Sequence, residues 1–363
     1  MWLSVASLRS RPGSCCALRK TPGVRRLRPG ILLLAVMLLV SCTPSSRVQT
    51  VQGESMGSGW MLSFVGAADS VDTVRKEAQR RLDQVDAQMS TWKADSDLSR
   101  YNKAPAETWV EVPVDLYQVI AAALKLAAET GGAYDPSVGP LVDLWGFGPS
   151  PARRAPPDAA TIAEMRARTG WQRIQLDPIA HRVWQPGGSR IDLSSIAPGF
   201  AVDWIAQFLE SQGHHDYLIE VGGELRGQGS KPDGTPWQVA IQRPLDSDRA
   251  DGEIDAQHVL GLTDAALGSS GDYRHFFEDG GRRYAHRIDP RTGYPLDNNV
   301  ASVTVMSANC QDADPLATAL SVLGVEQGLA FAEQRGIAVL YILRSADGFE
   351  ERMSPGFAAL LGE

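Results

Sequence analysis

Apolar residues recur every three or four positions in two long stretches of the chain. The first stretch predicts an amphipathic helix over about residues 70–90, with Ser70 as its N-cap. The second predicts a helix over about 114–130 that stops at Gly131 and Gly132. The apolar positions that carry the first helix are Val74, Ala78, Leu82, Val85 and Met89.

Shorter elements follow in an irregular order. Apolar runs predict strands at 217–221, 237–241, 301–305 and 337–343, and helical patterns cover 159–169, 199–212, 315–323 and 325–335. The acidic segment 245–256 is expected to be a loop insertion. Because strands and helices do not alternate regularly, the order favours an α+β fold, with mixed or antiparallel sheets and packed helices, over a doubly wound parallel sheet.

The N-terminal region has the pattern of an export signal. Seven Lys/Arg residues and no acid occur in the first 41 residues, and the apolar run 31–40 is followed by Ser41 and Cys42. Ten apolar residues are too few to span a bilayer but suit the core of a signal peptide. The run 39–42 resembles a bacterial lipobox, which implies that Cys42 carries a palmitate-type lipid anchor. The alternative is an ordinary secretory signal that is cleaved nearby.

Charge and size limit what the rest of the chain can do. Without residues 1–41, 28 basic side chains stand against 43 acidic ones, so the body would repel a phosphate backbone and nucleic acid is not an expected partner. We expect a signal peptide at 1–41, a polar tether at 42–55, one catalytic unit at 56–350 and a C-terminal tail at 351–363. Cys310 would then be a lone buried thiol without a disulfide partner.

Common nucleotide and metalloprotease motifs are absent: the chain contains no GxxxxGK[ST], no GxGxxG between strand and helix and no HExxH. Instead it has eight clusters rich in Gly, Asp and Ser that do not resemble ordinary turns. They lie at 55–59, 89–102, 132–141, 191–203, 220–224, 269–274, 284–293 and 312–320.

In this order the clusters resemble the ApbE family, the FAD:protein FMN transferases of bacterial envelopes, over nearly all of residues 55–345. The resemblance implies an ApbE-like, T-fold-related catalytic unit that uses Mg²⁺ as cofactor and FAD as donor. It further implies that FMN is attached through a phosphoester bond to a Thr or Ser of a respiratory or redox protein.

Asp314 and Thr318 are the candidate metal ligands. A spacing of four residues places a carboxylate and a hydroxyl on one face of a helix, and hard oxygen ligands suit Mg²⁺. The competing interpretation is that Asp314 before Pro315 is a helix N-cap. The resemblance implies further metal contacts from backbone oxygens at Ala317 and Ser195.

The resemblance also assigns a set of FAD-contacting positions, for several of which core packing or turn formation is the alternative. Pro198 departs from the family pattern, because many relatives carry Lys or Glu there. The assigned positions are Met56, Trp92, Ala133, Tyr134, Asp135, Asp192, Pro198 and Ile288.

His286 is the candidate catalytic base. It matches the family's proposed catalytic histidine, and imidazole suits proton transfer near neutral pH. The alternatives are a structural histidine, or a base role for Asp289 or Asp272.

Two other functions remain open from the sequence. One is an FAD pyrophosphatase that releases FMN and AMP, and the other is a non-catalytic flavin-binding lipoprotein. For each of these functions, the export signal and Cys42 predict a place in the bacterial cell envelope, with the protein held by a lipid on the periplasmic side of the inner or outer membrane.

Overall fold

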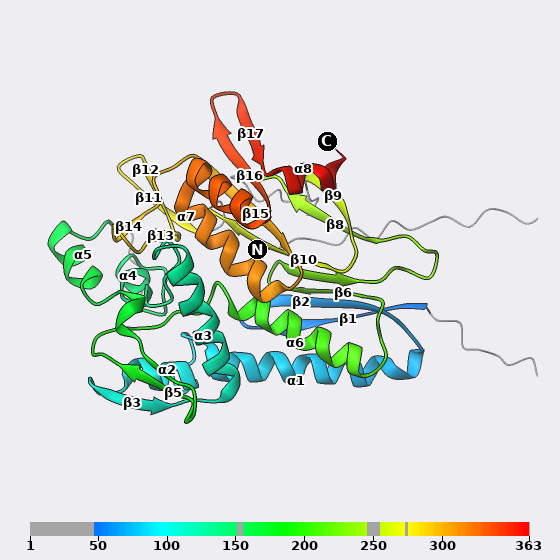
Figure 1. Cartoon of the computed structure of the whole chain (residues 1–363), viewed down its shortest axis with the longest axis horizontal. Coiled ribbons are helices and arrows are strands. Elements are labelled where there is room, and N and C mark those ends of the chain that lie inside the picture. Colours follow the sequence, from blue (N-terminus) through cyan, green and yellow to red (C-terminus); the bar gives the residue numbers. More distant parts are fainter. Residues whose placement is uncertain (1–46, 151–154, 245–254, 273–274, 363) are drawn as a thin grey trace, which may run out of the picture.

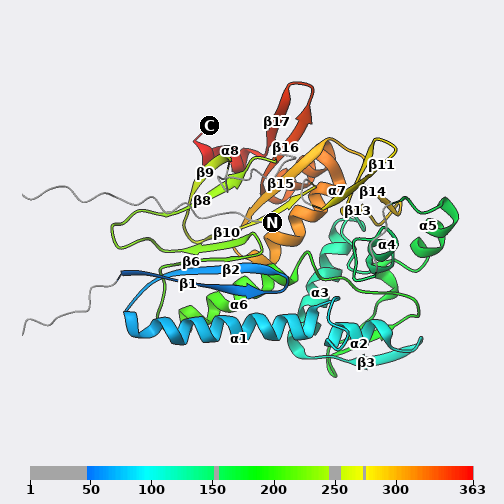
Figure 2. The same cartoon turned by 180° about the vertical axis from the view of Figure 1, so that it is seen from behind.

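A computed structural model describes residues 47–150, 155–244, 255–272 and 275–362. Its centre is an eight-stranded sheet, antiparallel throughout, in the order β1-β2-β6-β7-β10-β15-β16-β17 (Figures 1 and 2). The strands are β1 (Arg47–Ser55), β2 (Ser58–Gly66), β6 (Tyr217–Val221), β7 (Glu224–Gln228), β10 (Ala265–Gly271), β15 (Val300–Ser307), β16 (Ala338–Ser345) and β17 (Gly348–Met353).

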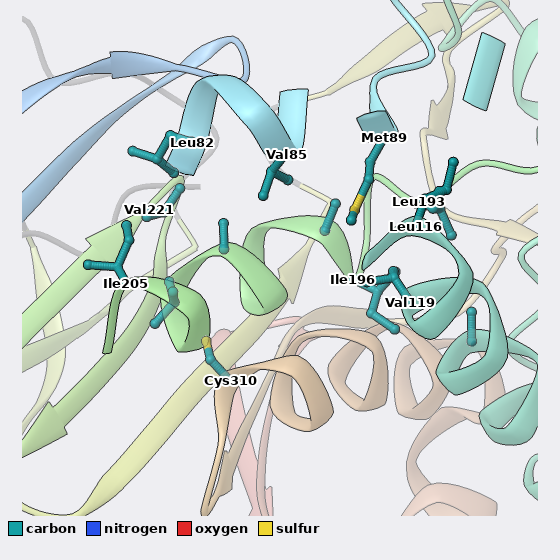
Figure 3. Packing of buried hydrophobic residues seen from close by; sticks show 14 of the residues in the cluster. Leu82, Val85, Met89, Leu116, Val119, Leu193, Ile196, Ile205, Val221 and Cys310 are labelled. Carbon is teal, nitrogen blue, oxygen red and sulfur yellow. The ribbon is translucent and has the colours of Figure 1, made fainter. Parts of the chain in front are cut away.

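Three long helices cover one face of this sheet: α1 (Val71–Met89), α6 (Ala197–Ser211) and α7 (Cys310–Arg335). Their apolar sides form the main core, in which Val85 and Met89 of α1 meet Ile196, Ile205 and strand β6 (Figure 3). The opposite face is covered by the hairpin β8 (Trp237–Gln242)–β9 (Ala256–Leu262) and by α8 (Pro355–Leu361). The α+β prediction is therefore confirmed.

The remaining elements form an extension beside the sheet (Figure 1). A three-stranded sheet, β3-β5-β4, and two small hairpins, β11-β12 and β13-β14, belong to it. Its elements are α2 (Asp97–Lys103), β3 (Thr108–Glu111), α3 (Val114–Glu129), α4 (Gly139–Leu144), α5 (Ala159–Arg166), η2 (Trp171–Arg173), β4 (Leu176–Asp177), β5 (Arg182–Gln185), β11 (Phe276–Asp279), β12 (Arg282–Ala285), β13 (Ile288–Asp289) and β14 (Tyr294–Pro295). The short turn η1 (Ala68–Ser70) directly precedes α1.

Both ends of the expected catalytic unit extend further than predicted. Residues 47–55 of the expected tether form β1, which pairs with β2 along its whole length although only Val51 is buried. The expected tail beyond residue 350 forms the end of β17 and α8, and Phe357 is fully buried. Residues 1–46, with Cys42, and 245–254 of the expected loop insertion lie outside the described residues.

Two helix ends are only partly as predicted. Ser70 lies at the N-cap position of α1, but its side chain caps no backbone amide, because its Oγ donates to the carbonyl of Ala67 at 2.7 Å. The two helices expected at 315–323 and 325–335 are confirmed as the two segments of α7, which is interrupted at Gly324 with φ +74°, although the first segment already begins at Cys310. Within the described part of the chain, α7 is the one helix long and apolar enough to cross a membrane, and here it packs against β10 and β15.

The first turns of α7 are wedged between α6 and β10 at two glycines. A Cβ added at Gly199 of α6 would lie 2.4 Å from the carbonyl oxygen of Cys310, and one at Gly268 of β10 would lie 2.4 Å from the amide nitrogen of Asp314. Neither distance is compatible with a side chain, so only glycine permits this approach. We call this contact the α7 wedge.

Replacing Gly268 by alanine should therefore push α7 away from the sheet. We expect Gly268→Ala to lower the free energy of unfolding by about 1–3 kcal/mol, as overpacking in a close-packed core does, measured by urea denaturation. Gly356→Ala in α8 is the matched control, because its nearest neighbour lies at an ordinary 3.6 Å. Equal stability of the two variants would contradict the wedge.

Candidate active site

The N-terminus of α7 is capped from two sides, and Asp314 takes no part in the capping. The side chain of Asn309 accepts from Asp312 N at 2.8 Å. Asp203 of α6 accepts from Cys310 N at 3.1 Å and from Gln311 N at 2.8 Å. The alternative in which Asp314 is the N-cap is therefore wrong, since its carboxylate is directed elsewhere.

The carboxylate of Asp314 points at the start of α6 instead. Its Oδ2 accepts from Gly199 N at 3.1 Å, and the residue is only 5% exposed. Burial raises the pKa of Asp314 to about 7. Nearby, burial and the charge of Asp314 raise the pKa of Glu224 on β7 well above its usual value, although Glu224 accepts from Ser269 N at 3.2 Å. Two neighbouring buried carboxyl groups make this a favourable place for a cation.

Thr318 lies one turn further along the same helix, so α7 places it on the face of Asp314 as the spacing predicted. Thr318 is half-buried and Ala317 between them is buried. Within the described residues no three His, Cys, Asp or Glu side chains form a metal-binding group. A metal here therefore needs hydroxyl, backbone and substrate oxygens in addition to Asp314, which is compatible with Mg²⁺.

Ser195 and Tyr134 meet beside this helix face. Ser195 Oγ donates to the Tyr134 hydroxyl at 3.3 Å. Burial raises the pKa of Tyr134, and the charge of Asp314 contributes in the same direction, which places Tyr134 close to that carboxylate. The structure thus brings together two predicted metal-site residues and one predicted FAD contact.

The loop that carries Ser195 is held by a residue that the sequence did not single out as functional. Asn102 of α2 accepts from Ile191 N at 2.8 Å and donates to Ile191 O at 2.9 Å, so both backbone groups of Ile191 are paired with one side chain. The sequence around Asn102, near the end of α2, carries no signal for this role, because its partner lies 89 positions away.

Asp135 and Asp192 stabilise turns around the site. Asp135 accepts from Ser137 N and Oγ and from Trp171 N, and Asp192 accepts from Ser194 N and Oγ. Asp192 therefore fixes its own loop, as Asx turns do, whereas Asp135 also holds its loop to the backbone of Trp171 in η2.

The remaining three predicted FAD contacts lie in buried or half-buried positions. Ala133 is buried, and Pro198 is half-buried at the first turn of α6, where proline suits helix geometry. Ile288 is 6% exposed and packs in a hydrophobic cluster with Leu141 and Trp145, so core packing accounts for its side chain.

Met56 and Trp92 have conformations that packing alone does not explain. Met56 has φ +54° in the two-residue turn between β1 and β2, a backbone region that non-glycine residues rarely adopt. Trp92 is 67% exposed in the loop after α1, three residues beyond Met89, which packs in the cluster around Ile196 (Figure 3). A large exposed aromatic ring is suited to stacking on a flat ligand.

His286 lies between β12 and β13 with its ring against Phe147 and His275. Its Nδ1 is 3.2 Å from the carbonyl oxygen of His275. A carbonyl only accepts, so Nδ1 carries the hydrogen and Nε2 presents a lone pair. Burial, followed by the charges of Arg287 and His275, lowers the pKa of His286 to about 4. The imidazole is therefore neutral at pH 7.

The two acids considered as alternative bases are engaged with arginines. Asp289 accepts from Arg291 Nε and Nη2, each at 2.9 Å. Asp272 accepts from both terminal nitrogens of Arg344, at 2.8 and 2.7 Å. These ion pairs favour His286 over either carboxylate as the group that accepts a proton.

Fold and site together define an α+β enzyme built on one antiparallel sheet. Its site residues are Asp314 and Thr318, which share one face of α7, and the neutral imidazole of His286. The ApbE family model matches residues 56–341, and the chain belongs to the ApbE family.

Curated relatives and solved structures match almost end to end. The FAD:protein FMN transferase of Haemophilus influenzae is 38% identical over 345 residues, which covers 93% of this chain and 99% of that protein. That of Vibrio cholerae is 39% identical over 336 residues, which covers 92% and 98%. The apo crystal structure of the Pseudomonas stutzeri flavinyl transferase ApbE superposes with a TM-score of 0.80 at 38% identity, over 88% of this chain and 98% of that one.

The buried carboxylate predicts a pH-dependent effect on stability. Because the pKa of Asp314 is raised from 3.8 to about 7 on folding, its contribution is favourable below pH 4 and is lost as the pH rises through 7. We therefore expect Asp314→Asn to melt higher than the wild type at pH 8 without Mg²⁺, by about 2–4 °C for each kcal/mol gained. The difference should vanish near pH 4.

Asp203→Asn is the control for this experiment. It weakens the cap of α7 and the 2.7 Å ion pair with Arg226, so it should melt lower at both pH values. An Asp314→Asn variant that melts lower than the wild type at pH 8 would show that the carboxylate stabilises the metal-free fold.

Proposed function

We propose that this protein transfers FMN from FAD to a Thr or Ser hydroxyl of a target protein, forming a phosphoester and releasing AMP. The near full-length similarity to FAD:protein FMN transferases supports the proposal. The observations that carry it in this chain are the Asp314–Thr318 face of α7 and a neutral His286, whose neighbour Arg287 donates to Ser321 of the same helix.

Mg²⁺ is the proposed cofactor, and the residues present fit it. Asp314 and Thr318 would hold the ion, with backbone oxygens at Ala317 and Ser195. The raised pKa values of Asp314 and Glu224 support this assignment, because a cation would favour the ionised forms that burial disfavours. When bound, Mg²⁺ supplies neutralisation of phosphate charge.

His286 is the proposed general base. Its Nε2 lone pair accepts the proton of the acceptor hydroxyl while that oxygen attacks the FMN phosphorus, and the phosphoanhydride bond to AMP breaks. The Nδ1 hydrogen bond to the His275 carbonyl holds the ring in the tautomer that this step requires. Exposed Trp92 and the strained turn at Met56 are the proposed contacts to the flat ring systems of FAD.

Mass spectrometry of coexpressed acceptor candidates tests this function directly. The expected result is an added FMN mass on a Thr or Ser. This adduct should form in the presence of FAD and Mg²⁺ and should not form when EDTA removes the metal. Rapid release of FMN and AMP without acceptor would favour the pyrophosphatase, and FAD binding that survives EDTA without turnover would favour a non-catalytic flavin carrier.

A His286→Asn variant should show whether His286 acts as a general base or as a structural residue. We expect folding and FAD affinity to persist while turnover falls by about 10²–10⁴-fold. The turnover of the wild type should fall only as the pH falls toward about 4, where the imidazole is protonated. The residual turnover of the variant should show no such fall at low pH. A parallel fall of FAD affinity, melting temperature and rate would instead indicate a scaffold.

The proposed location is the cell envelope, with the catalytic unit on the periplasmic side of the inner or outer membrane and Cys42 as the lipid-bearing residue. The order of basic residues, apolar run and Cys42 supports this proposal.

For this anchor, Cys42→Ala should release the protein from the membrane fraction without changing its activity in vitro. The measurement is fractionation of cells followed by a carbonate wash. Retention of the variant in the washed membranes would place the anchor elsewhere.

A further inference from the structure

Arg287 is a buried cation that joins three elements next to His286. Its side chain is 3% exposed. Nη1 donates to Ser321 Oγ of α7 at 2.9 Å, and Nη2 donates to the carbonyl oxygen of Val300 on β15 at 2.6 Å. Nη2 also lies 3.3 Å from Asp272 Oδ2, at the end of β10. One guanidinium therefore fixes the connection between β12 and β13, which carries His286, to both the sheet and the helix.

The contact on α7 falls in line with the proposed metal ligands. Asp314, Thr318 and Ser321 are spaced by four and three residues, so they lie along one face of the helix. At 1.5 Å per residue, Ser321 is about 10 Å along the axis from Asp314. Arg287 is thus connected to the same helix face that the proposed function assigns to the metal, two turns further on.

We propose that Arg287 and Ser321 act as a positioning pair that sets the distance and orientation of the His286 imidazole relative to the Asp314–Thr318 face of α7. The inference rests on the proposed function, because it concerns how the base is placed in that reaction. Neither side chain is assigned a contact with substrate; both act through His286.

The chemistry of the pair suits this task. A guanidinium is planar and donates in fixed directions, so contacts to Ser321 and Val300 define an orientation that a lysine ammonium could not. Asp272 is also held by two hydrogen bonds from Arg344, so removing Arg287 does not leave that carboxylate without a cation.

The pKa of His286 is a second quantity that can be measured. The charged or titratable groups that act on this ring are Arg287, His275 and Asp272. Of these, Arg287 lowers the pKa of His286 by its charge, whereas its hydrogen bonds to Ser321 and Val300 fix geometry. Variants can therefore separate the two effects.

Three variants and one control make the test. Ser321→Ala and Arg287→Lys keep the positive charge but lose part of the fixed geometry, and Arg287→Met loses both. Tyr341→Phe is the matched control, because it removes the 3.1 Å hydrogen bond to Leu320 O, one residue before Ser321, and leaves the Arg287–Ser321 hydrogen bond in place.

Steady-state kinetics with FAD, Mg²⁺ and an acceptor should show the loss in kcat and not in KM for FAD. We expect kcat to fall by about 10²-fold in Arg287→Met, as a misplacement of about 1 Å can cause, and by less in Ser321→Ala and Arg287→Lys. Histidine NMR titration should show the pKa of His286 rising only in Arg287→Met. Tyr341→Phe should match the wild type in both measurements.

A distance measurement keeps the inference separate from the proposed function. Mn²⁺, added in place of Mg²⁺, should broaden the NMR signal of His286 in the wild type. The broadening should change in Ser321→Ala and Arg287→Met and not in Tyr341→Phe. Unchanged broadening and kcat in both variants would overturn the positioning pair, as would a wild-type signal that Mn²⁺ does not affect. Absence of FMN transfer by the wild type, with the broadening pattern as expected, would overturn only the proposed reaction.

Discussion

The contact between α7 and its two glycine neighbours determines where the chemistry can occur. At Gly199 and Gly268 the backbones of α6 and β10 approach α7 so closely that no side chain fits. This approach brings the amide of Gly199 to the carboxylate of Asp314, and it lets Asp203 reach the first amides of α7. Helix position, helix cap and the buried acid are therefore consequences of the same close packing.

Buried charges of opposite sign occupy the two parts of the site. At the α7 wedge, Asp314 and Glu224 are acids whose ionisation burial opposes. Two turns along the helix, Arg287 and Arg344 surround one carboxylate, that of Asp272. A cation would favour the ionised forms of the two acids, whereas burial, followed by the charge of Arg287, keeps His286 neutral. This division suits a ligand whose metal-bound phosphates lie near Asp314 and Glu224 and whose reacting hydroxyl group would lie near His286.

The sequence predicted α1 and α3 because their apolar residues recur at helical spacing. It also predicted that Asp314 and Thr318 share one face of a helix. It failed where distant partners decide the structure. β1 has one buried residue and becomes a strand because β2 supplies nine pairing positions. Asp314 resembled an N-cap because Asp203, which reaches α7 from α6, is more than one hundred residues away in sequence. The low pKa of His286 likewise depends on folding around it and has no local signature.

The reactivity of Cys310 reports how often the α7 wedge opens. This residue is the one cysteine among the described residues, fully buried at the first turn of α7, with its carbonyl against Gly199. Burial raises the pKa of its thiol, so the closed protein holds it as an unreactive thiol. A thiol reagent can then modify Cys310 only during moments when the helix separates from its neighbours. The rate of that modification counts these openings, and it reports the lifetime of the closed site without any substrate present.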